Sequence, residues 1–168
     1  KPDRRQRQMC IRDRFNVIKH SNKINIDLKD SVILDLFSGS GSFGLEAISR
    51  GAKKCLFVEN YPSALLSLDK NIKNLKCQES SHLNKLDCFK FIENVQKNEL
   101  KLDIIFLDPP YREERINFII EEILKKNILN KNGIIIVHRH KKDNIKLTKK
   151  LKILDLRLYG ISKIIFAN

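Results

Sequence analysis

Short apolar runs alternate with amphipathic segments along most of this 168-residue chain, and this alternation limits the folds open to it. Apolar runs of about four to eight residues are typical of buried strands, whereas apolar residues three and four apart are typical of helices. Strands alternating with helices indicate βαβ units and a mainly parallel sheet covered on both faces. The expected strands are 31–37, 54–60, 81–87, 102–108 and 133–139, and the expected helices are 41–51, 62–76, 88–98 and 112–127.

The closing segment, residues 149–168, contains two further apolar strands that meet near Tyr159 and Gly160. Two strands joined by a tight turn lack the crossover that parallel neighbours require, so one of them is expected to be antiparallel. The sequence therefore predicts an α/β fold, with a doubly wound, mainly parallel sheet and a C-terminal antiparallel hairpin.

The length suits one domain with a sizeable core. No apolar run approaches the ~20 residues of a membrane span, and the first residues carry no apolar signal-peptide core. We therefore expect a cytoplasmic protein with no membrane partner. No C-x-x-C pair is present and no cysteine lies near a histidine at metal-ligand spacing, so we expect no metal and reduced thiols at Cys10, Cys55, Cys77 and Cys88.

The formal net charge of +13 arises from 33 lysines and arginines against 20 acidic residues. Cations that neutralise phosphates release counterions, so an excess of this size favours a polyanionic partner such as nucleic acid. Many of the lysines stand beside asparagine and isoleucine, however, which is typical of compositional bias. Charge alone leaves both interpretations open.

A glycine-rich loop, Gly39-x-Gly41-x-x-Gly44, follows the first expected strand and opens the first expected helix. Glycines let the backbone turn tightly, and a helix N-terminus offers free N–H groups to a ligand. Glu59 ends the next strand, twenty positions after Gly39, where a carboxylate can accept hydrogen bonds from ribose hydroxyls. The loop therefore predicts a nucleoside-containing ligand, and the alternative is a tight turn without one.

Asp35 stands just before these glycines, where a carboxylate would repel a pyrophosphate and attract an ammonium group. S-adenosylmethionine carries an amine and a sulfonium and no phosphate, so it fits this position better than a dinucleotide. Asp87, at the end of the third strand, has two interpretations that do not exclude each other. It could accept from an adenine amino group, or it could cap the helix expected over 88–98.

The sequence Asp108-Pro109-Pro110-Tyr111 ends the fourth expected strand. Prolines fix φ and stop the hydrogen-bond ladder, so the loop is expected to be stiff. It could present a carboxylate and a proline carbonyl as two acceptors for an exocyclic amino group, with Tyr111 as a stacking face for a base. The alternative is a turn in which Asp108 caps the next helix and Tyr111 packs against the protein.

The segments "DLFSGSGSFGLEAISRGA", "FVEN" and "FLDPPY" resemble the class I S-adenosylmethionine-dependent methyltransferases that carry a (D/N)PPY motif. From about Phe15 to the end, including "LRLYGISKIIF", the chain is more closely similar to the RsmD-like bacterial small-subunit ribosomal RNA guanine-N2 methyltransferases. The resemblance implies a seven-stranded Rossmann-like sheet and methyl transfer from S-adenosylmethionine to the N2 amine of a guanine in 16S ribosomal RNA. It implies ribosomal RNA or the small ribosomal subunit as partner, and we expect a monomer.

Residue roles follow from the same resemblance. Asp35, Gly39 and Gly41 would hold the methionine end of the cofactor, with Glu59 at its ribose and Asp87 at its adenine. The full expected set of cofactor-binding residues is Asp35, Phe37, Gly39, Gly41, Glu59, Asp87 and Cys88. The catalytic residues that would hold and orient the target amine are Asp108, Pro109, Pro110 and Tyr111.

Two other functions stay open. A DNA adenine-N6 methyltransferase also uses a D-P-P-Y loop, although this chain has no room for a separate target-recognition domain. A catalytically impaired RNA-binding protein on the same fold is the second alternative. His138 and His140 follow the fifth strand with no carboxylate at useful sequence spacing, so we expect them on the surface or in a supporting role. Phosphate contacts and plain solvent exposure are both open for Lys141 and Lys142.

Residues 1–14 depart from the family, whose members carry R-P-T-x-x-R-V-R-E-x-x-F-N before the domain. Lys1-Pro2-Asp3 resembles the start of that pattern and Phe15-Asn16 its end, but "RRQRQMCIRDR" between them differs in residues and in length. We interpret 1–14 as an atypical, disordered or foreign segment, because it lacks helical or strand periodicity. A basic RNA-binding arm is the alternative. The methyltransferase domain is expected over 15–168.

Overall fold

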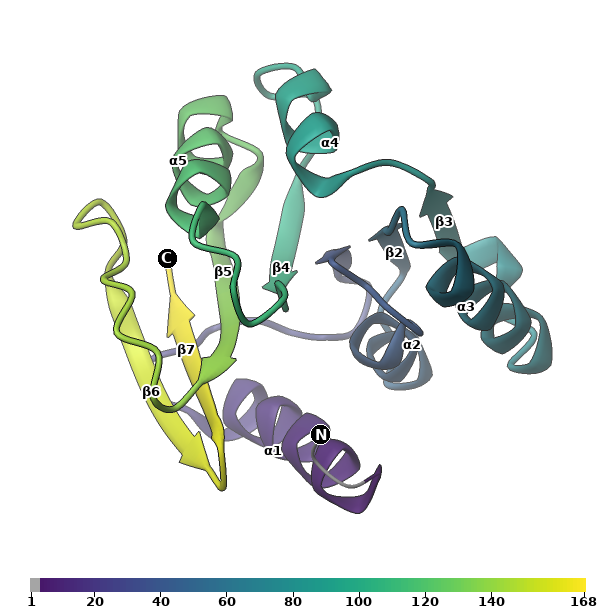
Figure 1. The fold of residues 1–168 in the computed structure, drawn as a ribbon, viewed down its shortest axis with the longest axis horizontal. Helices are drawn as coiled ribbons and strands as arrows, with labels where there is room; N and C mark the ends of the chain where they lie inside the picture. Colours follow the sequence, from purple (N-terminus) through teal and green to yellow (C-terminus); the bar gives the residue numbers. More distant parts are fainter. Residues whose placement is uncertain (1–3) are drawn as a thin grey trace.

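The computed structural model describes the backbone of residues 4–168 and the side chains of residues 11–168 (Figure 1). Its helices are α1 (Arg4–His20), α2 (Ser42–Ser49), α3 (Pro62–Asn74), the short η1 (Gln78–Ser80), α4 (Cys88–Asn94) and α5 (Ile116–Lys126). Its strands are β1 (Val32–Leu36), β2 (Lys54–Val58), β3 (Ser81–Asn84), β4 (Leu102–Leu107), β5 (Leu129–His140), β6 (Ile153–Tyr159) and β7 (Ser162–Ala167).

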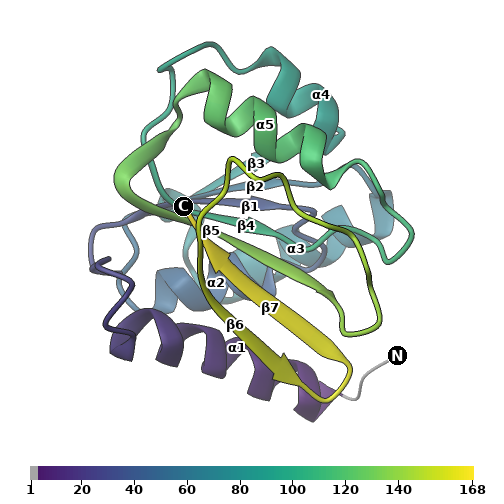
Figure 2. The same cartoon turned by 90° about the vertical axis from the view of Figure 1, so that its left-hand side faces the viewer.

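The seven strands form one sheet in the order β3-β2-β1-β4-β5-β7-β6. Strands β1 to β5 pair in parallel, and β7 pairs antiparallel with both β5 and β6. Helices lie on both sides of the sheet, with α4 and α5 on one side and α1 and α2 on the other (Figure 2). The doubly wound α/β fold and its C-terminal antiparallel hairpin are therefore confirmed.

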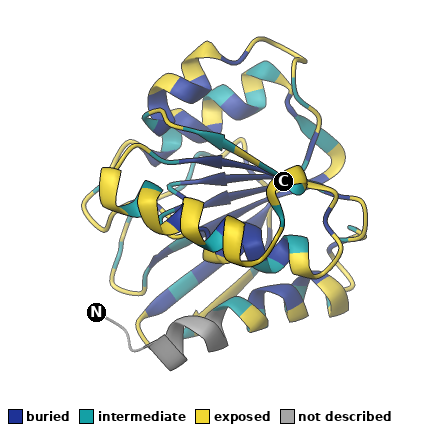
Figure 3. Cartoon of the chain, turned by 90° about the vertical axis from the view of Figure 1, so that its right-hand side faces the viewer, coloured by how far each residue is buried: buried dark blue, intermediate teal, exposed yellow. Residues whose placement is uncertain are grey.

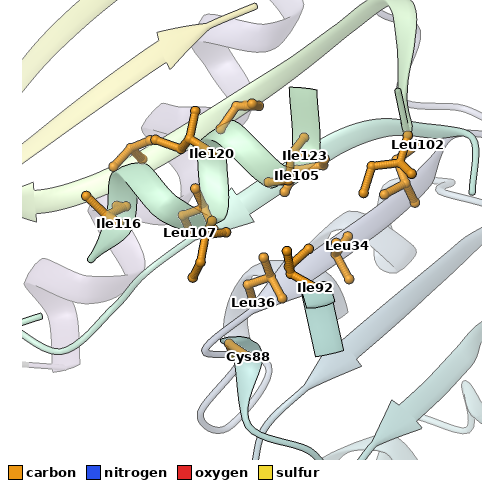
Figure 4. Packing of buried hydrophobic residues seen from close by; sticks show 14 of the residues in the cluster. Leu34, Leu36, Cys88, Ile92, Leu102, Ile105, Leu107, Ile116, Ile120 and Ile123 are labelled. Atoms are coloured by element: carbon orange, nitrogen blue, oxygen red, sulfur yellow. The ribbon is translucent and has the colours of Figure 1, made fainter. Parts of the chain in front are cut away.

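The central strands are buried on both faces because helices cover both (Figure 3). Alternate residues of a strand point to opposite faces, so Leu34 belongs to the core under α4 and α5, while Ile33 belongs to the core over α1, α2 and α3. Figure 4 shows the first of these cores, in which Ile116, Ile120 and Ile123 of α5 pack over β4, on the face of the sheet that α4 and α5 cover. This two-sided burial explains why these strands are apolar runs without polar alternation.

The strand order reverses between β1 and β4, because the chain builds outward from β1 to β3 and then returns to the other side of β1. In an open α/β sheet, ligands bind outside the carboxyl ends of the strands at such a reversal. The residues that follow β1 and β4 are the glycine loop and the Asp108–Tyr111 loop. The topology thus places the two sequence motifs side by side.

The N-terminal region differs from the expectation. Residues 4–14 belong to α1, which continues through residue 15 without a break, so the expected lack of regular structure is wrong there. The apolar side chains of α1 have helical spacing, but they lie on both sides of the boundary expected between residues 14 and 15. Phe15 and Ile18 are buried, and the partly buried Ile11 lies four positions before Phe15. Residues 1–3 and the side chain of Cys10 lie outside the described part. Whether the segment is foreign or a basic arm stays a prediction.

Several elements differ in their ends from the expected bounds: β3 ends at Asn84 instead of residue 87, α4 ends at Asn94 instead of residue 98, and α5 and β5 differ as well. Helix α5 begins at Ile116, not at residue 112, because Glu113 accepts from the backbone and side chain of Arg115 and closes a local turn. Strand β5 begins at Leu129, four residues early, and pairs through an irregularity between Leu102 and Ile104 of β4. In residues 4–168, no helix is long and apolar enough to cross a membrane.

A buried ion pair ties the loop after β4 to the end of β5. The side chains of Arg139 and Asp143 are 4% and 7% exposed and are paired with each other. Burial raises the pKa of Asp143, but the Ile145 N–H and the Arg139 guanidinium outweigh this and leave it below its usual value. The same guanidinium donates to the carbonyls of Pro110 and Tyr111, at 3.4 and 3.2 Å. It therefore fixes the path of the proline loop.

We predict that Arg139→Met lowers the free energy of unfolding by about 3 kcal/mol, because it leaves the Asp143 carboxylate buried without its partner. Urea unfolding followed by circular dichroism measures this. The double variant Arg139→Met/Asp143→Leu should recover most of the loss. The control is Arg157→Met, which breaks an exposed pair with Asp155 and should change the free energy little. Equal losses for Arg139→Met and Arg157→Met would contradict the prediction.

Candidate active site

A cavity of about 470 Å³ opens at the carboxyl ends of β1 and β4. Its volume lies in the range of small-molecule sites. The charged residues on its wall are Asp13, Arg14, Asp35 and Asp108, so acidic groups predominate there although the protein carries a net charge of +13. The remaining wall comes from the glycine loop, the start of α2, His138 and the turn between β6 and β7.

Asp35 is the buried acid of this wall, with 1% of its surface exposed. Its Oδ2 accepts from the backbone N–H of Gly44, in the first turn of α2, at 3.0 Å. Burial raises the pKa of Asp35 well above its usual value; the Gly44 N–H and the Arg14 guanidinium lower it, while the charges of Asp108 and Glu59 raise it further. A cation entering the cavity would favour the ionised carboxylate.

The glycine loop forms the predicted turn from strand to helix. Gly39 and Gly41 have φ values of 55° and 80°, the left-handed region that glycine adopts without strain. A Cβ on Gly41 would meet Leu68 Cδ1 of α3 at 2.3 Å, and one on Gly44 would meet Cys55 Sγ of β2 at 2.4 Å. The loop therefore lies too close to α3 and β2 for larger residues at these two positions.

Glu59 fastens this loop rather than lining the cavity. Its Oε2 accepts from Gly39 N at 2.8 Å, and its Oε1 accepts from the N–H groups of Asn60 and Tyr61 at 2.9 Å. Both carboxylate oxygens thus bind backbone amides, one of the glycine loop and two leading into α3. A contact of Glu59 with a ribose stays a prediction.

Asp87 is the N-cap of α4, as one of the two sequence interpretations had it. Its Oδ1 accepts from Phe89 N at 2.9 Å and from Lys90 N at 3.2 Å. These bonds satisfy two N–H groups that have no partner within the helix. Asp87 lies outside the main cavity, so its contact with adenine stays a prediction.

Cys88 supports the wall from behind. Its Sγ accepts from the N–H of Phe37 at 3.2 Å, and its thiol donates to the Val58 carbonyl at 3.8 Å. Burial raises the pKa of the thiol to about 12, so it stays protonated. Phe37 itself lines the cavity with a positive φ of 60°. Of these two predicted cofactor-binding residues, Phe37 lines the cavity, whereas Cys88 does not and instead binds the backbone N–H of Phe37.

Asp108 lines the cavity together with the glycine loop and is the exposed acid of the site, with 43% of its side chain accessible. Its Oδ1 bonds to Nδ1 of His138 at 2.8 Å. It does not cap α5, whose N-cap is Arg115, so that alternative is wrong. The Pro110 carbonyl is taken by Glu113 N and Arg139, whereas no described residue donates to the Pro109 carbonyl.

A second cavity of about 240 Å³ adjoins the first and shares Asp108, His138, Ile161 and Ser162 with it. Pro109, Tyr111 and His140 complete one side of it. Tyr111 is 62% exposed, and its ring meets the His140 ring edge-on with centroids 5.3 Å apart. Tyr111 is therefore not packed into the protein, which leaves its face open to a flat ligand.

The structure gathers some predicted residues and separates others. Those on the main cavity wall are Asp35, Phe37, Gly39 and Asp108; Pro109 and Tyr111 line the second cavity; Gly41, Glu59, Asp87, Cys88 and Pro110 line neither. The residues of the main wall that the sequence reasoning did not name as site residues are Ile11, Asp13, Arg14, Ser38, Ser40, Ser42, Phe43, Phe106, Tyr159, Gly160, Ile161 and Ser162. The antiparallel hairpin was the available signal for the last four, because β7 must begin where β5 ends.

Comparison with known proteins agrees with this architecture. A family model described as conserved hypothetical protein 95 matches residues 8–168. Ribosomal RNA small subunit methyltransferase D of Haemophilus influenzae is 36% identical over 115 residues, which are 68% of this chain and 59% of that protein. The protein of the same name from Buchnera aphidicola subsp. Baizongia pistaciae is 30% identical over 145 residues, covering 80% of this chain and 72% of that protein.

Solved structures extend the agreement to the fold. A candidate methylase from Haemophilus influenzae superposes with a TM-score of 0.77 at 27% identity, covering 96% of this chain and 97% of that one. The chain spans 56% to 62% of the length of three curated relatives, from Bacillus subtilis, Haemophilus influenzae and Buchnera aphidicola. Since the family model nevertheless matches nearly the whole chain, this protein belongs to the family described as conserved hypothetical protein 95.

Proposed function

We propose that this protein is an S-adenosylmethionine-dependent methyltransferase that modifies the N2 amine of a guanine in 16S ribosomal RNA. One observation carries the proposal: a small-molecule cavity with an acidic wall lies at the strand reversal of a strongly basic protein. The cavity suits a compact cation, and the exterior suits a polyanion. The names of the relatives, which are ribosomal RNA small subunit methyltransferases, support the same reaction.

The cavity wall fits the cofactor chemically. Asp35 is a buried carboxyl whose pKa is raised, so an ammonium group at this wall would relieve the cost of its burial. Gly39 exposes loop backbone on the wall, and a Cβ there would meet nothing within 4 Å. When bound, S-adenosylmethionine supplies an electrophilic methyl group. The protein's part is to hold it beside Asp108 and to keep Asp35 as its counter-charge.

We propose that Asp108 and Pro109 receive the target amine. A guanine N2 is a weak nucleophile because its lone pair is delocalised into the ring. Acceptors for its two N–H groups favour tetrahedral nitrogen and aim the lone pair, and the loop offers two: the Asp108 carboxylate and the unoccupied Pro109 carbonyl. Tyr111 offers its ring for stacking of the base. Most of the acceleration would come from positioning and from preorganised charge.

The RNA would approach the same edge of the sheet. Lys141 and Lys142 follow β5 and are exposed, as are Arg112 and Arg115 beside the proline loop. Cations around a site contact phosphates and position the substrate without reading sequence. We propose that the protein acts as a monomer on ribosomal RNA or on the small subunit, which places its work in the cytoplasm.

The direct test is methyl transfer from labelled S-adenosylmethionine to unmodified small subunits, their free RNA and DNA, followed by nucleoside analysis. We expect N2-methylguanosine in the ribosomal RNA. N6-methyladenine in DNA would contradict the substrate while keeping the role of the proline loop. Cofactor binding without transfer to any nucleic acid would favour an RNA-binding protein on this fold.

We predict that Asp108→Ala lowers kcat by on the order of 100-fold or more, because it removes a preorganised acceptor for the amine. The dissociation constant of S-adenosylhomocysteine should stay within about twofold, since other residues hold the cofactor. Single-turnover assays and calorimetry measure the two quantities. Asp155→Ala, on the exposed β6 strand, is the matched control and should leave both unchanged. Wild-type activity in Asp108→Ala would contradict the assigned role.

We predict that binding of S-adenosylhomocysteine releases protons at pH values near the raised pKa of Asp35. Burial raises the pKa of Asp35 in the free protein, whereas the ligand's ammonium favours the ionised carboxylate, so binding lowers this pKa and displaces the proton. Affinity should therefore increase as the pH rises. Calorimetry in buffers of different ionisation enthalpy measures the proton number. Asp35→Asn should bind more weakly and release fewer protons; equal release in both proteins would contradict the prediction.

A further inference from the structure

A chain of hydrogen bonds joins three strands at the site. The Oδ1 of Asp108, after β4, bonds to Nδ1 of His138 in β5 at 2.8 Å. The Nε2 of the same ring bonds to Oγ of Ser162, the first residue of β7, at 2.9 Å. Both ring nitrogens of His138 therefore have partners. A histidine held at both nitrogens has a fixed ring orientation.

The order Asp–His–Ser is also that of a serine hydrolase, but the exposure here is reversed. In a hydrolase the serine faces the substrate and the aspartate is buried. Here Ser162 is buried at 7% exposure, the His138 side chain is 23% exposed, and the Asp108 side chain is 43% exposed. The accessible end of the chain is the carboxylate. The three hydrogen-bonded residues therefore hold the Asp108 carboxylate at the accessible end of the chain of bonds, and Ser162 lies at the buried end.

Ser162 can set the tautomer of the ring. A serine hydroxyl donates one hydrogen, and when it donates to Nε2 the neutral imidazole carries its own hydrogen on Nδ1. That Nδ1–H then points at Asp108 Oδ1. The backbone of Ser162 is paired with His140 on one side and with Tyr159 on the other, so its hydroxyl stands on a rigid element.

We propose that His138 is a positioning residue for methyl transfer. Its Nδ1–H occupies Oδ1 of Asp108, holds the carboxylate in one rotamer and leaves Oδ2 for the target amine, while Ser162 fixes the tautomer that makes this possible. The inference rests on the proposed function, because it assigns a role within that reaction. No other side chain among residues 11–168 bonds to the Asp108 carboxylate, so without His138 it could rotate.

Substitutions at His138 separate the two ring nitrogens. His138→Asn keeps an N–H donor near the position of Nδ1, which faces Asp108. His138→Gln keeps a polar group only near the position of Nε2, which faces Ser162. His138→Phe removes the polar groups at both positions. Misplacement of a reacting group by about 1 Å can cost on the order of 100-fold in rate. We expect a kcat loss of about that size for His138→Gln and His138→Phe, and a loss below about tenfold for His138→Asn.

Controls distinguish positioning from folding. The KM for S-adenosylmethionine and the dissociation constant of S-adenosylhomocysteine should stay within about twofold in all three variants, because Asp35 and the glycine loop are untouched. His82→Asn, an exposed histidine on β3, is the matched control and should leave kcat unchanged. Equal losses in His138→Asn and His138→Phe, or wild-type kcat in His138→Phe, would overturn the proposal.

Nitrogen NMR of the histidine rings gives a readout that does not depend on turnover. We expect His138 to carry a hydrogen on Nδ1, assigned by the signal lost in His138→Phe, and a mixture of the two tautomers in Ser162→Ala. An Nε2–H tautomer in the wild-type protein would overturn the proposal even if methyl transfer is observed. Absence of any transfer by the wild-type protein would overturn the proposed function, and the NMR result would still show whether His138 is bound to Asp108.

Discussion

The reversal of strand order between β1 and β4 is the constraint on which the rest of the structure depends. It puts two loops that are distant in the sequence next to each other, one rich in glycine and the other containing two prolines. Asp35, before the first loop, and Asp108, at the start of the second, then face one cavity, and the charge of Asp108 helps to raise the pKa of Asp35. The glycine loop and the Asp108–Tyr111 loop, to which we assign cofactor and target amine, both lie at this contact between strands.

Charge is distributed in opposite ways inside and outside. The cavity wall carries three carboxylates and one arginine, whereas the whole chain carries an excess of 13 positive charges. A small cation and a large polyanion can therefore be attracted to neighbouring surfaces of the same domain without competing for one. The charged side chains that hold the loops of the site in place are themselves bound to other groups of the protein. Glu59 is bound to backbone amides, and Arg139 is buried with Asp143 against the proline loop.

The sequence was sufficient to predict those parts of the structure that depend on residues close together in the chain. The glycine turn, the cap at Asp87 and the antiparallel hairpin follow from residues within a few positions of one another. The contact of His138 with Asp108 could not be read in this way, because it depends on the pairing of β4 with β5. Helix α1 was missed because a boundary was drawn through its apolar stripe, between Ile11 and Phe15.

The position of β7 has a consequence for how the protein is made. β7 follows both β5 and β6 in the chain but lies between them in the sheet. During synthesis, β6 emerges before the strand that it must pair with, and β5 keeps an unpaired edge until β7 arrives. The two edges cannot bond to each other without excluding β7. Because Ser162 belongs to β7, its bond to the His138 ring is the last of these contacts to form, and a nascent chain that ends before β7 would have the glycine loop without the full support of the Asp108 carboxylate.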